Sequence, residues 1–132
     1  MKSINARCIV AGKAKGHVLF SSSPIAFLQG VDPEKGEVSD KKHELYGKTF
    51  AGRVLVFPHA VGSSVGAYVI YRLRKNAKAP RAIVNQNSDI ITASGCAIAG
   101  IPLFDLPKNE IGELESAKSI RIEENGEIVV LN

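Results

Sequence analysis

Cysteine and tryptophan are scarce in this sequence, which contains no tryptophan and two cysteines, Cys8 and Cys96. The two cysteines lie far apart, and neither belongs to a C-x-x-C pair. Because a structural zinc or an iron–sulfur cluster needs about four ligands, this pair cannot hold either one by itself. We expect both thiols to be small buried hydrophobic groups, and any metal chemistry to come from a partner.

Long apolar runs are missing as well. No segment approaches the ~18 consecutive apolar residues that cross a membrane, and residues 1–7 lack the apolar stretch of a secretory signal. We therefore expect a cytoplasmic protein with no membrane contact. Of the 132 residues, 45% are hydrophobic and 23% charged, which is typical of a globular protein with its own core. A single domain over residues 1–132 is predicted.

Acidic residues are the minority, with 13 Asp and Glu against 17 Lys and Arg and a net charge of +4. Much of the local excess of positive charge lies toward the C-terminal end of a predicted helix, where cations complement the helix dipole. A nucleic-acid interface is the alternative, but no recognised motif or strand with interleaved aromatic residues supports it, and we expect no nucleic-acid partner. The basic residues concerned are Arg72, Arg74, Lys75, Lys78 and Arg81.

The hydrophobic pattern predicts a mixed α/β architecture, with β-rich ends around an α/β centre. Strands are predicted over residues 4–10 and 17–20, with a turn over 12–16 between them. Residues 21–50 form a long section without a clear period. A loop of this length in a compact domain is usually functional or disordered, and its apolar Ile25, Phe27 and Leu28 argue against disorder.

A strand, a helix and a parallel strand are predicted in the centre of the chain. Residues 54–57 are a continuous apolar run, apolar residues then recur at helical spacing from Val65 to Asn76, and residues 81–84 are extended. This order is typical of a right-handed crossover unit. We further predict a helix over 89–98 capped by Ser88, a strand over 101–104 and a hairpin at Asn125-Gly126.

The Gly62-Ser63-Ser64 turn lies between the buried central strand and the predicted helix. Backbone N–H groups at a helix start are free, and the helix dipole is positive there. Such a place suits an anionic group and can stabilise a serine that loses its proton. The alternative is structural, because serine is a common helix cap: Ser63 would cap the helix and Ser64 would begin it.

Other polar residues are weaker candidates. Asp32, Asp40 and His43 lie in the long section, where they suit proton transfer or substrate orientation but also plain turn formation. His59 lies close to the Gly-Ser-Ser turn. Asn85 and Asn87 follow the strand ending at Val84, on the side where α/β sheets bind ligands.

An ordered series of motifs resembles the swivel domain of the aconitase X family, in its free-standing small-subunit form. The matching region runs from about Gly12 to Pro102. It comprises residues 25–36, with Asp40, His43, Leu45 and Gly47 after them, then residues 52–58, 62–66, 79–83 and 100–102.

The resemblance implies a β/β/α swivelling domain, inactive alone, that closes over a cluster-bearing large subunit. In archaeal members it implies a hydro-lyase of the mevalonate pathway, which dehydrates (R)-5-phosphomevalonate to trans-anhydromevalonate 5-phosphate. The expected cofactor is an iron–sulfur cluster, [4Fe–4S], on the large subunit and none on this chain. Dehydration needs a base beside a carboxylate and an acid that helps hydroxide to leave, and the two subunits would divide these roles.

The resemblance also assigns residues. The first serine of Gly-Ser-Ser is the family's proposed proton acceptor, and that position here is Ser63. Gly62, Ser64, Val65 and Gly66 are then expected to bind a carboxylate or phosphate of the substrate through the helix N-terminus. Asp32 is expected to face the same cleft. No metal ligand is assigned to this chain.

Three positions depart from the family pattern. Ordinary aconitases follow the two serines with arginine, whereas Val65 stands here, so a cation over the base has to come from elsewhere. Gln29 replaces a frequent glycine and Glu44 a frequent proline. Two alternatives remain open: a dehydratase for another hydroxy acid or for hydroxyproline, and a non-catalytic anion-binding or interaction module.

Overall fold

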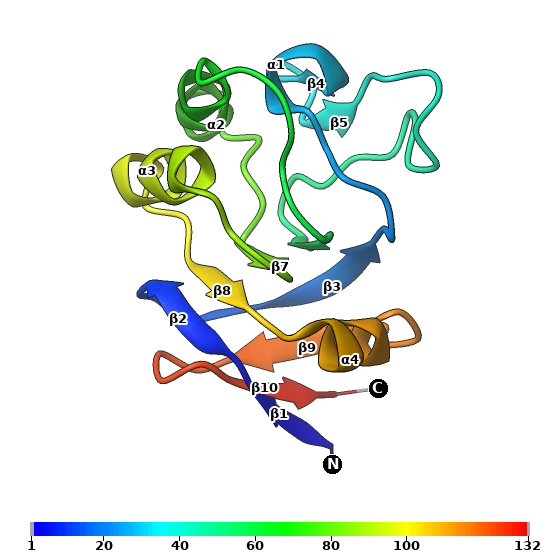
Figure 1. Ribbon diagram of the computed structural model, residues 1–132, viewed down its shortest axis with the longest axis vertical. Coiled ribbons are helices and arrows are strands. Elements are labelled where there is room, and N and C mark those ends of the chain that lie inside the picture. The colour runs from blue at the N-terminus through cyan, green and yellow to red at the C-terminus, as the bar shows by residue number, and fades with distance from the viewer. Residues whose placement is uncertain (1, 132) are drawn as a thin grey trace.

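A computed structural model describes residues 2–131, and its centre is one eight-stranded sheet in the order β1-β10-β9-β3-β6-β7-β8-β2 (Figure 1). Strands β3, β6, β7 and β8 run parallel, and every other neighbouring pair is antiparallel. The strands are β1 (Ser3–Asn5), β2 (Arg7–Val10), β3 (Ala14–Phe20), β6 (Val54–Val56), β7 (Ala82–Asn85), β8 (Leu103–Asp105), β9 (Ser119–Ile122) and β10 (Glu127–Val130). The helices are α1 (Phe27–Gly30), α2 (Gly66–Lys75), α3 (Ile90–Ala99), α4 (Lys108–Ile111) and the 3₁₀ turn η1 (Gly112–Leu114).

The central strands separate two hydrophobic cores. Successive side chains of a strand point to opposite faces, so Val54 and Val56 of β6 enter one core while Leu55 and Phe57 enter the other. Helices α1, α2 and α3 cover the second core, and β9, β10 and β1 close the first (Figure 1). The continuous apolar run of β6 is therefore explained by burial on both faces, and the predicted β/β/α class is confirmed.

The sheet is curved, so that its two edge strands, which follow each other in the chain, lie next to each other. β1 and β2 are the edges, and the single residue Ala6 joins them. Ala6 donates its N–H to the carbonyl of Gly126 at 2.8 Å, which holds the joint against the β9–β10 turn. The prediction of one strand over 4–10 was wrong here, because β1 pairs with β10 and β2 pairs with β8.

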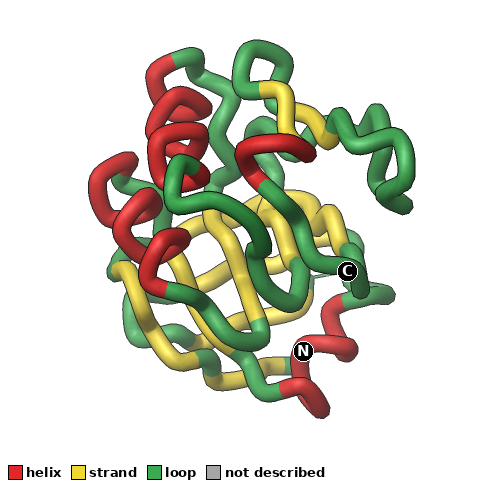
Figure 2. Tube along the Cα trace, turned by 45° about the horizontal axis from the view of Figure 1, so that its top comes forward, coloured by secondary structure: helices red, strands yellow, loops and turns green. Residues whose placement is uncertain are grey.

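The crossover unit forms as predicted. β6 and β7 pair in parallel with Leu55 opposite Ile83, and α2 connects them. α3 repeats the connection between β7 and β8, so that α2 and α3 lie side by side on one face (Figure 2). Both helices begin at the carboxyl ends of parallel strands, the edge at which α/β sheets bind ligands.

Ser88 does not cap α3, contrary to the prediction. The cap is Asp89, whose side chain accepts the N–H of Thr92 at 3.4 Å. The Ser88 hydroxyl instead donates to the Asp105 carboxylate at 2.5 Å, and its N–H bonds the same carboxylate. The hydroxyl of Ser88 thus ties the start of α3 to β8.

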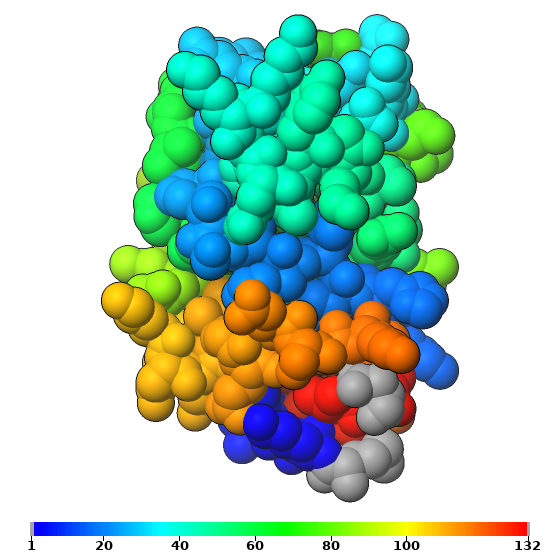
Figure 3. All heavy atoms as spheres, turned by 90° about the vertical axis from the view of Figure 1, so that its right-hand side faces the viewer, coloured from blue at the N-terminus to red at the C-terminus, as the bar shows by residue number. Residues whose placement is uncertain are grey.

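The segment 21–50 is ordered by packing although its sequence shows no period. It contains α1 and a small hairpin of β4 (Val31–Asp32) with β5 (Glu37–Val38). Ile25, Phe27 and Phe50 are buried in the core shared with α2 and α3. The segment covers the upper part of the face that Figure 3 shows.

Glu44 fastens this segment to the end of β3. Its carboxylate accepts the hydroxyl of Ser21 at 2.5 Å and the N–H of Ser22 at 2.9 Å. The hydrogen bond from Ser21 lowers the pKa of Glu44 below its usual value of 4.5; desolvation opposes it, and the N–H of Ser22 and the charge of His43 act with it.

Replacing Glu44 by Gln is expected to lower thermal stability slightly at neutral pH. A carboxyl with a lowered folded-state pKa contributes stability above its unfolded pKa and loses it as pH falls through the folded-state value. The unfolding temperatures of wild type and Glu44→Gln should therefore differ at pH 7, begin to approach each other as the pH falls below the usual value of 4.5, and converge below the folded-state pKa. The effect should stay below ~1 kcal/mol because the carboxylate is exposed. A difference that persists unchanged into strong acid would contradict this account.

The C-terminal hairpin is confirmed at Asn125-Gly126, where β9 pairs with β10 in antiparallel register. The side chain of Asn125 accepts the N–H of Glu127 at 3.0 Å, and Gly126 adopts a φ of 94°. α4 and η1 were not predicted; Ile111 and Leu114 bring them onto the core lined by β9 and β10. None of the helices within residues 2–131 is both long and apolar enough to cross a membrane.

Candidate functional site

Ser63 lines a cavity of about 50 Å³ at the carboxyl edge of the parallel strands. Residues after β6 are held beside Ile25 by two hydrogen bonds, from the Ile25 N–H to the His59 carbonyl and from the Val61 N–H to the Ile25 carbonyl. This brings the Gly-Ser-Ser turn over α1 and beside the start of α3. The lining residues are Phe27, Ala60, Val61, Gly62, Ser63, Gly66, Ile70, Asp89, Ile91 and Thr92.

The hydroxyl of Ser63 is exposed and faces a backbone donor. Its oxygen accepts the N–H of Val65 at 3.1 Å, and its carbonyl accepts the N–H of Gly66 at 3.0 Å. α2 itself has no side-chain cap, because its N-cap residue is Val65. Ser63 therefore orders the turn that leads into α2 with the kind of hydrogen bond expected of a capping serine, although α2 itself begins three residues later, at Gly66. An N–H already pointing at this oxygen strengthens its bond as negative charge develops there.

The other predicted residues of the turn lie around Ser63. Gly62 has a φ of 103°, a left-handed conformation that suits glycine, and it lines the cavity with Gly66. Ser64 and Val65 form the turn between them and are exposed, Val65 by 46%. The structure thus gathers Gly62, Ser63 and Gly66 at one cavity, whereas Ser64 and Val65 are exposed and do not line it.

Two cavity residues were missed by sequence reasoning. Asp89 and Thr92 come from the first turn of α3, which lies far along the chain from Ser63. Thr92 is 1% exposed, and its hydroxyl oxygen is the one buried side-chain polar atom without a hydrogen-bond partner among residues 2–131. The available signal was an Asp directly before an apolar helix and a Thr one turn later, and that signal predicts only a helix cap.

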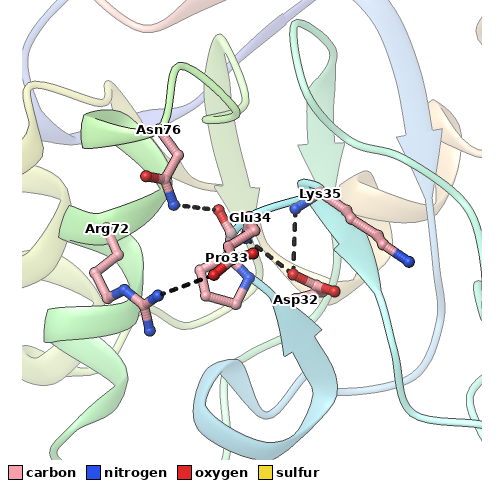
Figure 4. A network of polar contacts seen from close by, with 6 residues as sticks. All are labelled: Asp32, Pro33, Glu34, Lys35, Arg72 and Asn76. Carbon is pink, nitrogen blue, oxygen red and sulfur yellow. Dashed lines mark hydrogen bonds and ion pairs between the residues drawn. The ribbon is translucent and has the colours of Figure 1, made fainter.

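Asp32 does not lie at this cavity. Its carboxylate accepts the N–H groups of Glu34 and Lys35 at 2.9 and 3.2 Å, which is the bonding of a turn (Figure 4). The turn is fixed to the C-terminal end of α2, since the side-chain amide of Asn76 donates to the Pro33 carbonyl at 2.8 Å. Ser63 precedes the opposite end of α2. A contact between Asp32 and a substrate therefore stays a prediction, and within this chain the two candidates are separate.

The remaining candidates have structural roles. His43 bonds the Pro24 carbonyl and the N–H of Leu45, both at 3.0 Å, and Asp40 accepts the N–H of Lys42. Asn85 is fully buried and donates to the Phe57 carbonyl at 2.9 Å, which links β7 to the end of β6. His59 is exposed beside the turn.

The side chains of this chain do not fit a metal cluster. Cys8 is exposed and Cys96 is buried, so the prediction that both are buried was wrong for Cys8. Burial, with a smaller contribution from the charge of Asp89, raises the pKa of Cys96 to about 12, whereas metal ligation needs a thiolate. Within the described part of the chain, no three His, Cys, Asp or Glu side chains come together as ligands.

Comparison with known proteins decides the family. The family model described as the aconitase X swivel domain matches residues 3–131. The chain belongs to the aconitase X swivel-domain family. Arg72, Arg74 and Lys75 of this aconitase X domain lie in the last turn of α2, as predicted for cations that complement the helix dipole.

The similar proteins cover almost the whole domain. The phosphomevalonate dehydratase small subunit of Thermococcus kodakarensis is 43% identical over 97% of this chain and 96% of its own length. The protein of the same name from Methanothermobacter thermautotrophicus is 43% identical over 91% and 92%. The crystal structure of Thermococcus kodakaraensis aconitase X in its holo form aligns over 100% of both chains with a TM-score of 0.93 and 41% identity.

Proposed function

We propose that this aconitase X domain is the small subunit of a phosphomevalonate dehydratase, a hydro-lyase that is active only with its large subunit. The proposed reaction removes water from (R)-5-phosphomevalonate to give trans-anhydromevalonate 5-phosphate. The observation that carries the proposal is the position of Ser63, an exposed serine with a backbone donor on its oxygen, in a domain that is 43% identical to named small subunits over nearly their full length.

Ser63 is the proposed proton acceptor. The reaction removes a proton from the carbon next to the substrate carboxylate, and the electron pair of that C–H bond forms the new double bond as hydroxide leaves. To act as a base Ser63 gives up its own hydroxyl proton, and its oxygen gains negative character as that proton leaves; the N–H of Val65 is already directed at it. Interactions that strengthen only as this charge develops lower the barrier rather than merely binding the substrate.

The turn around Ser63 supplies the proposed binding contacts. Gly62, Ser64, Val65 and Gly66 adjoin the serine in the turn, and the positive dipole end of α2 favours a substrate carboxylate or phosphate there. Val65 contributes an apolar side chain, 46% exposed, where the large subunit is expected to close over the site. The iron–sulfur cluster implied by the family is proposed to lie on that large subunit, since the side chains here do not fit one.

The test is anaerobic co-purification with the candidate large subunit, followed by dehydration assays on (R)-5-phosphomevalonate, hydroxyproline and other 3-hydroxy acids. We expect a stable complex that turns over the phosphorylated substrate. Turnover of hydroxyproline and of no other acid would identify the complex as a hydroxyproline dehydratase. A complex that forms but dehydrates none of these acids would favour the anion-binding module, for which the start of α2 is the supporting feature.

A further inference from the structure

Asp89 is the one charged side chain among the described residues that line the Ser63 cavity. It stands at the start of α3, it is exposed to solvent, and its carboxylate accepts the N–H of Thr92. Within residues 2–131, no lysine or arginine lines the cavity. A serine anion at Ser63 would therefore share the cavity with a carboxylate and with no lysine or arginine of the described residues.

Two negative charges in so small a space repel each other, which disfavours a free serine anion beside an ionised Asp89. The conflict disappears when the proton of Ser63 passes to Asp89 during the reaction, because the cavity then carries one negative charge throughout. A volume of about 50 Å³ exceeds the 10–15 Å³ that one water molecule needs, so a water has room to bridge the two side chains.

Thr92 gives an independent reason to place a polar group here. Its hydroxyl oxygen is buried without a hydrogen-bond partner, although Thr92 lines this same cavity. A buried hydroxyl left unpaired is unfavourable, which marks this part of the cavity wall as polar. The lining thus places the carboxylate of Asp89 and the hydroxyl of Ser63 at one cavity, with Thr92 beside them.

We propose that Asp89 receives the hydroxyl proton of Ser63 through a water in this cavity, and so acts as the positioning residue that makes Ser63 basic. The inference rests on the proposed function of Ser63. As the serine oxygen takes the proton from the substrate carbon, its own proton moves through the water to Asp89, and no free serine anion forms. The leaving hydroxide then takes the proton from Asp89 and becomes water, which restores both side chains.

Asp89→Asn is the test in the assembled complex. Asparagine caps helices as well as aspartate does, so α3 and the fold should be retained. Loss of a proton acceptor is expected to lower kcat about 100-fold with little change in KM. The pH profile of kcat should also differ between the wild type and the variant, because only the wild type has a carboxylate at residue 89. Asp89→Glu, which restores the carboxylate, should have a kcat about tenfold higher than that of Asp89→Asn.

Asp40→Asn is the matched control, because Asp40 also bonds one backbone N–H but does not line the cavity. It should leave kcat unchanged. Wild-type activity in Asp89→Asn, alongside an inactive Ser63→Ala, would overturn the role of Asp89 and leave that of Ser63. A lower kcat with an unchanged pH profile and no recovery by Asp89→Glu would make Asp89 a structural residue only. A wild-type complex without dehydratase activity would overturn both proposals.

Discussion

Ser63→Ala should reduce kcat of the assembled dehydratase by about 10²–10⁴-fold and leave complex formation unchanged. The variant removes the oxygen that takes the substrate proton, while the hydrogen bond from the Gly66 N–H to the carbonyl of residue 63 still forms the turn before α2. The fold should therefore survive. The dehydration rate tests the loss of kcat, size-exclusion chromatography tests complex formation, and thermal unfolding tests whether the fold is retained.

Ser94→Ala is the matched serine control. Ser94 is exposed in the middle of α3 and does not line the cavity, so its replacement should leave kcat within about twofold of wild type. An assembled Ser63→Ala complex that keeps more than a tenth of the wild-type kcat would exclude Ser63 as proton acceptor. The base would then have to be sought on the large subunit.

Gly126→Ala should be the most destabilising of the substitutions considered. Gly126 has a φ of 94°, and a Cβ built there would collide with the carbonyl oxygen of Ala6. Ala6 is the joint between β1 and β2, and its N–H bonds the Gly126 carbonyl. Backbone strain and collision together should cost about 3 kcal/mol or more and lower Tm by about 10 °C.

Gly112→Ala controls for the loss of a glycine as such. Gly112 has a helical φ of −63°, and a Cβ there meets no atom within 4 Å. Its replacement should leave Tm unchanged or raise it slightly, because alanine reduces the freedom of the unfolded chain. Equal unfolding temperatures for Gly126→Ala and wild type would show that the joint between the two edge strands tolerates displacement.

The central part of the fold was predictable because its signals are local. β6, α2 and β7 follow one another within one crossover unit, and Asn125-Gly126 specifies its own hairpin. The break at Ala6 was not predictable, since it arises when β1 and β2 find different partners at opposite ends of a curved sheet. α4 has four residues, too few for a helical period to show.

Of the candidate site, only the residues of the Gly-Ser-Ser turn and the start of α2 were predictable. Gly62, Ser63 and Gly66 are close in sequence, so a motif and the start of a helix point to them. Asp89 and Thr92 reach the same cavity because α3 packs beside α2, and that is a tertiary contact. Asp32 was expected in the cleft, yet the hairpin that carries it is fastened by Asn76 to the far end of α2.

The most direct test of the account is product formation from (R)-5-phosphomevalonate by the purified two-subunit complex, followed by the appearance of the vinylic proton of trans-anhydromevalonate 5-phosphate in NMR spectra. The account predicts this signal with both wild-type subunits, and its loss when either subunit is omitted or when Ser63 is replaced by alanine. Equal product formation by the large subunit alone would contradict it.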